Sequence, residues 1–159
     1  RETDEWLKQN VRSTRNFIRK WGHFVKHDAL LKPIVPSKYD IGFVVANCPH
    51  SVLYQLEPWC STIYTDWGYK TYIDTEQKET MFDLKDRVKS RLEDTHDNDI
   101  LVEFDSGELN EEQFGFLTQL PEILDNDENL EEGSFNLGIF KITINKIKTY
   151  EGDLIKCER

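Results

Sequence analysis

Hydrophobic residues recur at three- and four-residue steps through the first 25 positions of the chain. The repeating positions are Trp6, Leu7, Val11, Thr14, Phe17, Ile18, Trp21 and Val25. This spacing places them on one face of an amphipathic helix. Thr3 can cap the start of this helix, and Gly22 can close its end. The pattern predicts an N-terminal helical arm, followed by an extended connector at 32–37 that contains two prolines.

Beyond the connector, short β-rich runs alternate with helical patterns. Strands are predicted at 40–46, 61–65 and 99–104, and either one long bulged strand or two short strands at 135–144. Helices are predicted at 49–57, 76–92 and 110–120, the last opened by an Asn110/Gln113 capping box and kinked or ended by Pro121. This alternation is typical of βαβ units. The predicted fold class is α/β: a three-layer, mostly parallel short sheet (βαβαβαβ) preceded by the helical arm, with 40–46 as a central strand.

The composition fits one packed domain, because 38% of the 159 residues are hydrophobic and 31% are charged. We divide the chain into a basic helical arm with its proline linker, residues 1–36, and an acidic α/β domain, residues 37–159. No apolar run reaches the roughly 18 residues of a membrane span, and residues 1–20 lack the apolar centre of a signal peptide, so we expect a cytoplasmic protein. Because the helical pattern starts almost at Arg1, we also expect a piece of a longer protein.

Charge is distributed unevenly along the chain, whose net charge is −10. Residues 1–38 carry nine Lys and Arg against four acids, whereas residues 92–132 carry fifteen acids and no Lys or Arg. This asymmetry predicts that the arm either folds against the body or reaches an acidic partner. We favour the first, because docking neutralises both charges in place. The excess of acids argues against nucleic-acid binding, for which only the arm supplies a basic face.

Polar residues follow three of the predicted strands, at positions where open parallel sheets bind ligands. The candidate binding rim is Asn47, His50, Asp66, Trp67, Asp105 and Ser106. Asp66 and Asp105 are candidate metal ligands, and Mn²⁺ or Mg²⁺ would be the cofactor if the rim binds a sugar nucleotide. The simpler interpretation, that these side chains cap helices and start turns, is the favoured one. No catalytic residue is assigned.

Other motifs carry less chemistry. Cys48 and His50 could form a nucleophile and base, but residues two apart at a helix start point in different directions. His23 and His27 have a zinc-like spacing but lack the Glu of the HExxH motif. The acidic segment 125–136 lacks the glycine and the glutamate of a calcium loop. The three cysteines (Cys48, Cys60 and Cys157) lack CxxC spacing and are expected to be reduced.

The stretch from Glu2 to Leu7 and from Asn16 to Gly22 resembles the tail of family-2-type (GT-A) glycosyltransferases, whose final helix often ends in a Lys-Trp-Gly element. The resemblance covers about the first 22 residues. It implies that the chain continues from a sugar-transferring domain, with residues 37–159 as an appended module of the kind found on large phage or marine microbial transferases. The catalytic carboxylates and metal motif of that family have no assignable match here.

Three functions follow from these observations. The favoured one is a non-catalytic accessory domain of a glycosyltransferase-like protein that positions an acceptor or partner. It predicts an exposed apolar surface on the arm, through which the rest of a longer polypeptide or another protein would bind. The second is an independent metal- or nucleotide-sugar-binding domain, which predicts a docked arm and a concave rim with converging carboxylates. The third is an assembly module, which the sequence cannot separate from the first.

Overall fold

A computed structural model describes residues 2–23, 26–34, 37–66 and 68–147 of the chain. The helices are α1 (Glu2–Trp21), α2 (His50–Leu56), α3 (Tyr69–Glu76), α4 (Leu84–Arg87) and α5 (Glu111–Asn126), with 3₁₀ turns η1 (Glu57–Trp59), η2 (Gln77–Glu79) and η3 (Ser106–Glu108). The strands are β1 (Lys26–His27), β2 (Pro33–Ile34), β3 (Ile41–Ala46), β4 (Thr62–Thr65), β5 (Val88–Ser90), β6 (Ile100–Asp105), β7 (Gly133–Leu137) and β8 (Phe140–Ile144). The predicted α/β class with an N-terminal helix is confirmed.

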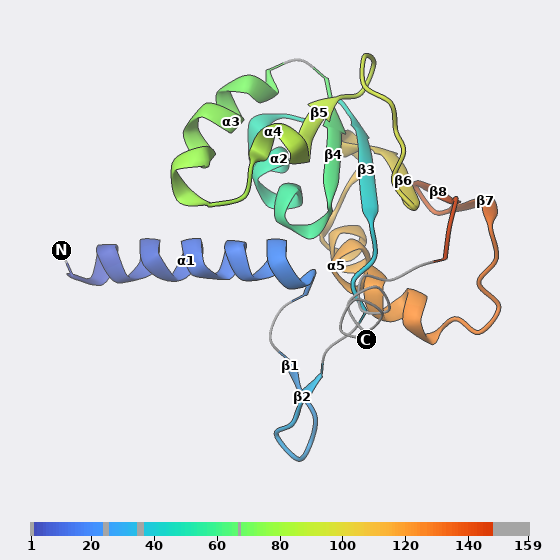
Figure 1. Cartoon of the computed structure of the whole chain (residues 1–159), viewed down its shortest axis with the longest axis horizontal. Helices are drawn as coiled ribbons and strands as arrows, with labels where there is room; N and C mark the ends of the chain where they lie inside the picture. The colour runs from blue at the N-terminus through green and yellow to red at the C-terminus, as the bar shows by residue number, and fades with distance from the viewer. Residues whose placement is uncertain (1, 24–25, 35–36, 67, 148–159) are drawn as a thin grey trace, which may run out of the picture.

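A six-stranded sheet in the order β5-β4-β3-β6-β8-β7 forms the centre of the molecule (Figure 1). β3 pairs in parallel with β4 and β6, and β4 pairs in parallel with β5. β8 is antiparallel to both β6 and β7, so the edge of the sheet is a β-hairpin. The position of β3 between β4 and β6 confirms the predicted central strand. Strand order reverses at β3, which makes the β3/β6 boundary a topological switch point.

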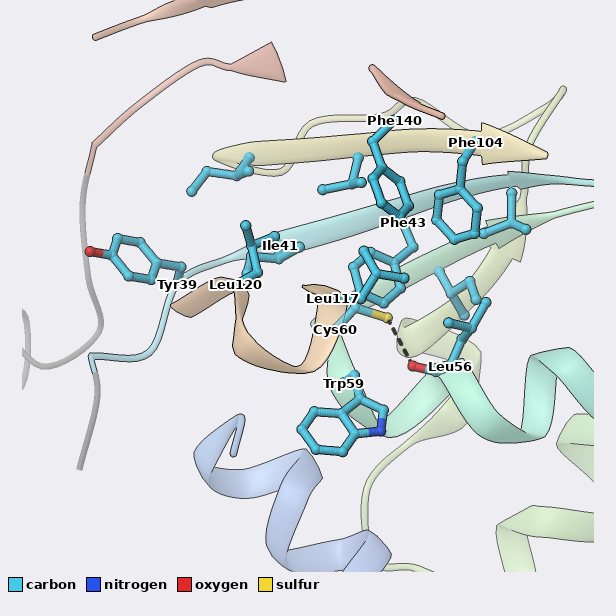
Figure 2. Close-up of a cluster of buried hydrophobic side chains, with 14 of the residues drawn as sticks. Tyr39, Ile41, Phe43, Leu56, Trp59, Cys60, Phe104, Leu117, Leu120 and Phe140 are labelled. Carbon is cyan, nitrogen blue, oxygen red and sulfur yellow. Dashed lines mark hydrogen bonds between the residues drawn. The ribbon is translucent and has the colours of Figure 1, made fainter. Parts of the chain in front are cut away.

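Most of the core lies on one face of the sheet. Alternate β3 side chains, Phe43 and Val45 among them, join one buried cluster with residues of all five helices. Figure 2 shows part of this cluster, including Phe43 of β3, Leu56 of α2 and Leu117 of α5. The opposite face buries a smaller cluster of Val44, Tyr64 and Leu101. No described helix contributes to that cluster, and a three-layer arrangement is not confirmed. The β5–β6 connection covers Tyr64 instead, because the Tyr64 hydroxyl donates to Asn98 at 2.7 Å.

The predicted arm, α1, docks on the body. Ile18, Arg15 and Arg19 are buried, and α1 contacts η1. Gly22 has a left-handed φ of 81° and its N–H donates to the Ile18 carbonyl at 2.7 Å, so it ends the helix as predicted. After α1, Pro33 and Ile34 of the expected connector form β2, which pairs antiparallel with β1, a hairpin that the sequence analysis did not predict.

The predicted helix at 76–92 is wrong. Met81 and Leu92, two residues of its proposed apolar face, are 101% and 81% exposed. After Glu76, the last residue of α3, only α4 is α-helical there, with Asp83 as its N-cap, and Val88 starts strand β5. The tertiary structure decides this segment, because β5 completes a parallel ladder with β4 and Arg87 turns toward a buried carboxylate. Upstream of it, α3 forms from Tyr69 to Glu76, where the sequence analysis expected no helix before residue 76.

The capping box at the start of α5 is confirmed by both reciprocal Asn110 and Gln113 hydrogen bonds, each 2.9 Å long. The helix does not end at Pro121 but continues to Asn126. Pro121 and the neighbouring Leu120 and Leu124 are buried, so packing offsets the backbone hydrogen bond that proline cannot donate. The segment at 135–144 resolves into two short strands, one of the two predicted alternatives.

Candidate functional site

The residues that leave β3, β4 and β6 meet around Asn47. The Asn47 side-chain amide donates to Asp105 Oδ2 at 2.8 Å, and its backbone N–H donates to Asp66 Oδ2 at 2.9 Å. The Ser106 hydroxyl donates to the Asn47 carbonyl. Asn47 has a left-handed φ of 55°, a conformation that asparagine tolerates better than most side chains. Four of the six predicted rim residues therefore lie together at the switch point.

The two carboxylates of this cluster have different environments. Partial burial opposes the charge on Asp66, but hydrogen bonds from the Asn47 N–H and the Arg91 guanidinium outweigh it and lower the pKa of the Asp66 carboxyl. Arg91 Nε lies 2.8 Å from Asp66 Oδ1. Asp105 accepts the Gly107 N–H at 2.8 Å and caps η3, as the simpler interpretation predicted. Asp66 is therefore an ionised acceptor at neutral pH, with lone pairs left for a ligand.

The predicted cap at the start of α2 is not formed. The N-cap residue is Pro49, with no side-chain hydrogen bond, and Asn47 bonds to Asp105 instead. The reason is the long-range contact between the ends of β3 and β6, which local sequence does not reveal. In the described part of the chain, no group of three or more His, Cys, Asp or Glu residues is placed to hold a metal ion. Asp66 and Asp105 remain candidate ligands that Asn47 bridges.

A pocket of about 430 Å³ opens beside this cluster, at the carboxyl ends of β3 and β4. Its lining residues are Asn47, Cys48, Pro49, His50, Leu53, Thr65, Asp66, Gly68 and Tyr69. The volume is in the range of small-molecule sites. The pocket brings together Asn47, His50 and Asp66 of the predicted rim, while Trp67 lies outside the described residues. Sequence analysis missed Tyr69, although its place directly after a strand-exit turn could have indicated it.

The Cys48/His50 pair considered from the sequence does not supply a nucleophile to this pocket. Burial, with a further contribution from the Asp66 charge, raises the pKa of the Cys48 thiol to about 12. The thiol is therefore protonated at neutral pH and unsuited to nucleophilic attack. The His50 ring packs edge-on against Tyr72, with ring centroids 5.5 Å apart, so α3 supports it from behind. The side chain of His27, half of the possible zinc pair, lies outside what the structure describes.

Sequence analysis also missed a buried ionic network behind the pocket. Glu57 is fully buried and accepts hydrogen bonds from Arg19, from Arg87 Nε at 2.8 Å and from the Tyr72 hydroxyl at 2.7 Å. Arg15 Nη2 donates to the same hydroxyl at 2.7 Å. No local motif could have revealed these contacts, because each joins elements far apart in the chain. The network ties α1 to the α3 wall on which His50 packs.

We find, among the described residues, no helix with both the length and the apolar character needed to cross a membrane. No protein-family model matches the chain, and neither the curated proteins nor the solved structures provide a match. The comparisons thus identify no glycosyltransferase-related domain.

Proposed function

We propose that this chain is a small-ligand-binding α/β domain whose pocket at the exits of β3 and β4 takes a nucleotide sugar or a related nucleotide. The observation that carries the proposal is the Asn47 bridge, which gathers Asp66 and Asp105 beside a pocket of about 430 Å³. Ligands of open α/β sheets bind outside the carboxyl ends of the strands, where strand order reverses. The pocket lies at the carboxyl ends of β3 and β4, and β3 is also one of the two strands of the β3/β6 boundary.

Asp66 gives this pocket its ligand preference. It directly follows the second parallel strand, 19 residues after Asn47, where nucleotide-binding α/β folds place an acid that binds ribose hydroxyls. An ionised carboxylate accepts hydrogen bonds and cannot donate them, so the ligand must offer hydroxyl or N–H donors here. The loop after β3 contains no G-x-G-x-x-G motif, so a dinucleotide held by its pyrophosphate on this loop is disfavoured. A bound Mn²⁺ or Mg²⁺ would take Asp66 and Asp105 as ligands.

Thermal unfolding tests this proposal. We expect nucleotide sugars, with or without Mg²⁺ or Mn²⁺, to stabilise the chain by about 2.7 kcal/mol at a hundred times their dissociation constant. Asp66→Asn keeps the size of the side chain but removes its charge, and it should abolish the shift. Asp86→Asn, on the exposed side of α4, is the matched control and should leave the shift intact. An equal shift in both variants, or none with the unmodified chain, would reject the proposal.

A second function is favoured by the exposed surface of α1. Trp6, Val11 and Trp21 are 65%, 46% and 42% exposed, and the N-terminal half of α1 projects away from the sheet (Figure 1). Such a surface fits an accessory domain of a glycosyltransferase-like protein, with α1 contacting the neighbouring domain. The test applies to any glycosyltransferase-like domain that the same gene encodes: it is expressed separately and its binding to this chain is measured. Trp6→Gln should weaken binding, Lys146→Gln should not, and no binding would reject this role.

A further inference from the structure

A second pocket adjoins the first on the far side of Tyr69. It has a volume of about 400 Å³ and is built by α3, α4 and β5 at the edge of the sheet. Its lining residues are Tyr69, Lys70, Ile73, Asp74, Lys85, Val88, Lys89 and Asp94. Tyr69 lines both pockets, so the two pockets are neighbours that share one aromatic side chain.

Three lysines give the second pocket an anion-binding character. Lys70 and Lys85 are exposed and Lys89 is half-buried. Ile73 and Val88, 9% and 2% exposed, provide an apolar floor. Each ammonium group carries three hydrogen-bond donors. In the described part of the chain, none of these ammonium groups has a hydrogen bond or an ion pair.

Two acids also line this pocket, and they do not cancel the lysines. Asp94 accepts the backbone N–H of Ser90 at 2.7 Å, which ties it to the turn after β5. Three lysines and the two acids, Asp74 and Asp94, leave the lining of the pocket with a net charge of +1. The whole chain, in contrast, has a net charge of −10. An anion is therefore attracted to this pocket more than to the acidic surface around it.

The charges also fix the direction of a bound ligand. Asp66 is ionised in the first pocket and repels a phosphate, while it attracts hydroxyl and N–H donors. We propose that Lys70, Lys85 and Lys89 form a phosphate subsite for the ligand whose hydroxyl-bearing part binds at Asp66, with Tyr69 between the two parts. The ligand class is a nucleoside or sugar phosphate. This inference rests on the proposed function in one respect, which is that the hydroxyl-bearing part of the ligand binds in the first pocket.

Calorimetric titrations at low salt test the subsite, with uridine, adenosine, their 5′-diphosphates and inorganic pyrophosphate as probes. The diphosphates should bind at least about tenfold more tightly than the nucleosides, the gain expected from hydrogen bonds to a charged group. Lys85→Met and Lys70→Met should remove this gain and leave nucleoside binding unchanged. Lys146→Met, an exposed lysine outside both pockets, is the control. Because the substituted lysines are exposed, the thermal midpoints should not change.

The outcomes separate this subsite from the proposed function. Equal affinity of both lysine variants and the unmodified chain for the diphosphates would overturn the subsite. A diphosphate that binds no better than its nucleoside would also overturn it. Pyrophosphate binding that Lys85→Met removes, without any nucleoside binding, would support the phosphate subsite and reject the role given to Asp66. Nucleoside binding that Asp66→Asn removes, without tighter binding of the diphosphates, would support the role given to Asp66 and overturn the phosphate subsite.

Discussion

The side-chain amide of Asn47 donates a 2.8 Å hydrogen bond to Asp105, a residue 58 positions further along the chain. This bond joins the ends of β3 and β6 at the point where strand order reverses. Because Asn47 is in the left-handed region, its backbone N–H can reach Asp66 at the same time. One residue therefore holds together the exits of three strands, and the pocket beside them depends on it.

Substitution of Asn47 should lower stability through two separable effects, which are the loss of the hydrogen bond to Asp105 and strain in the left-handed backbone. Asn47→Ala loses the bond to Asp105 and places a less tolerant residue at a φ of 55°, so we expect the free energy of unfolding to fall by about 1–3 kcal/mol. Asn47→Gly loses the bond but accepts the conformation, and it should cost about 1 kcal/mol less than alanine. Urea denaturation measures both. Equal values for the two variants would show that backbone conformation contributes nothing here.

Removal of the Glu57 charge should destabilise the fold far more than removal of a surface charge. Glu57→Gln leaves Arg19 and Arg87 buried without their main anion, which typically costs about 3–5 kcal/mol. The control is Glu79→Gln, at the exposed pair with Arg12, which should cost less than about 1 kcal/mol. Chemical denaturation compares them. A Glu57→Gln cost as small as the control would mean that the network does not fasten α1.

The same carboxylate predicts a dependence of stability on pH. Burial opposes its charge, but hydrogen bonds from Arg19 and the charges of Arg87 and Arg19 prevail and lower the pKa of Glu57 from 4.5 to about 2. The folded state therefore binds this proton less readily than the unfolded state. Its contribution is complete above about pH 4.5 and is lost as the pH falls toward 2. Unfolding curves between pH 6 and 2.5 should fall less steeply for Glu57→Gln than for the unmodified chain, and parallel slopes would contradict this.

Two glycine substitutions should have opposite signs. A Cβ on Gly42 in β3 would lie 2.4 Å from Asn98 Oδ1 and 2.7 Å from its Cγ, so Gly42→Ala should destabilise by about 1–3 kcal/mol. A Cβ on Gly115 in α5 meets no atom within 4 Å, and Gly115→Ala should stabilise by about 0.5–1 kcal/mol through helix propensity. Thermal unfolding measures both changes. A neutral Gly42→Ala would show that Asn98 can move away at no cost.

Much of the fold was accessible from local patterns. The spacing of Trp6 to Ile18 predicted α1, the Asn110/Gln113 pair predicted the start of α5, and the apolar run at 40–46 predicted β3. The rule that ligands of open sheets bind at the strand exits also named Asn47, Asp66 and Asp105 as candidate residues, but whether they meet depends on strand order, which the sequence left open. These predictions succeeded because caps, periodicity and strand burial depend on neighbouring residues or on a general rule of sheet topology.

Predictions failed where distant contacts competed with local pattern. The apolar spacing at 76–92 indicated one helix. Instead, pairing with β4 makes 88–90 a strand, and Arg87 just before it donates a hydrogen bond to buried Glu57. Of the two alternatives for Pro121, a kink or the end of the helix, the end is wrong, because α5 continues past Pro121 to Asn126. Neither the Glu57 network nor the lysine pocket has a sequence signature, because their members come from separate elements.

The sequence by itself determined the α/β class, the docking-competent helix at the N-terminus and the polar residues at the strand exits. Those properties follow from periodicity, capping and charge, which act over a few residues. The tertiary structure alone decided the strand order, the Asn47 bridge and the placement of two pockets on either side of Tyr69. These depend on which strands pair across the sheet, and strand pairing is set by the packing of the core, to which all five helices and strands β3, β4, β5, β6 and β8 contribute.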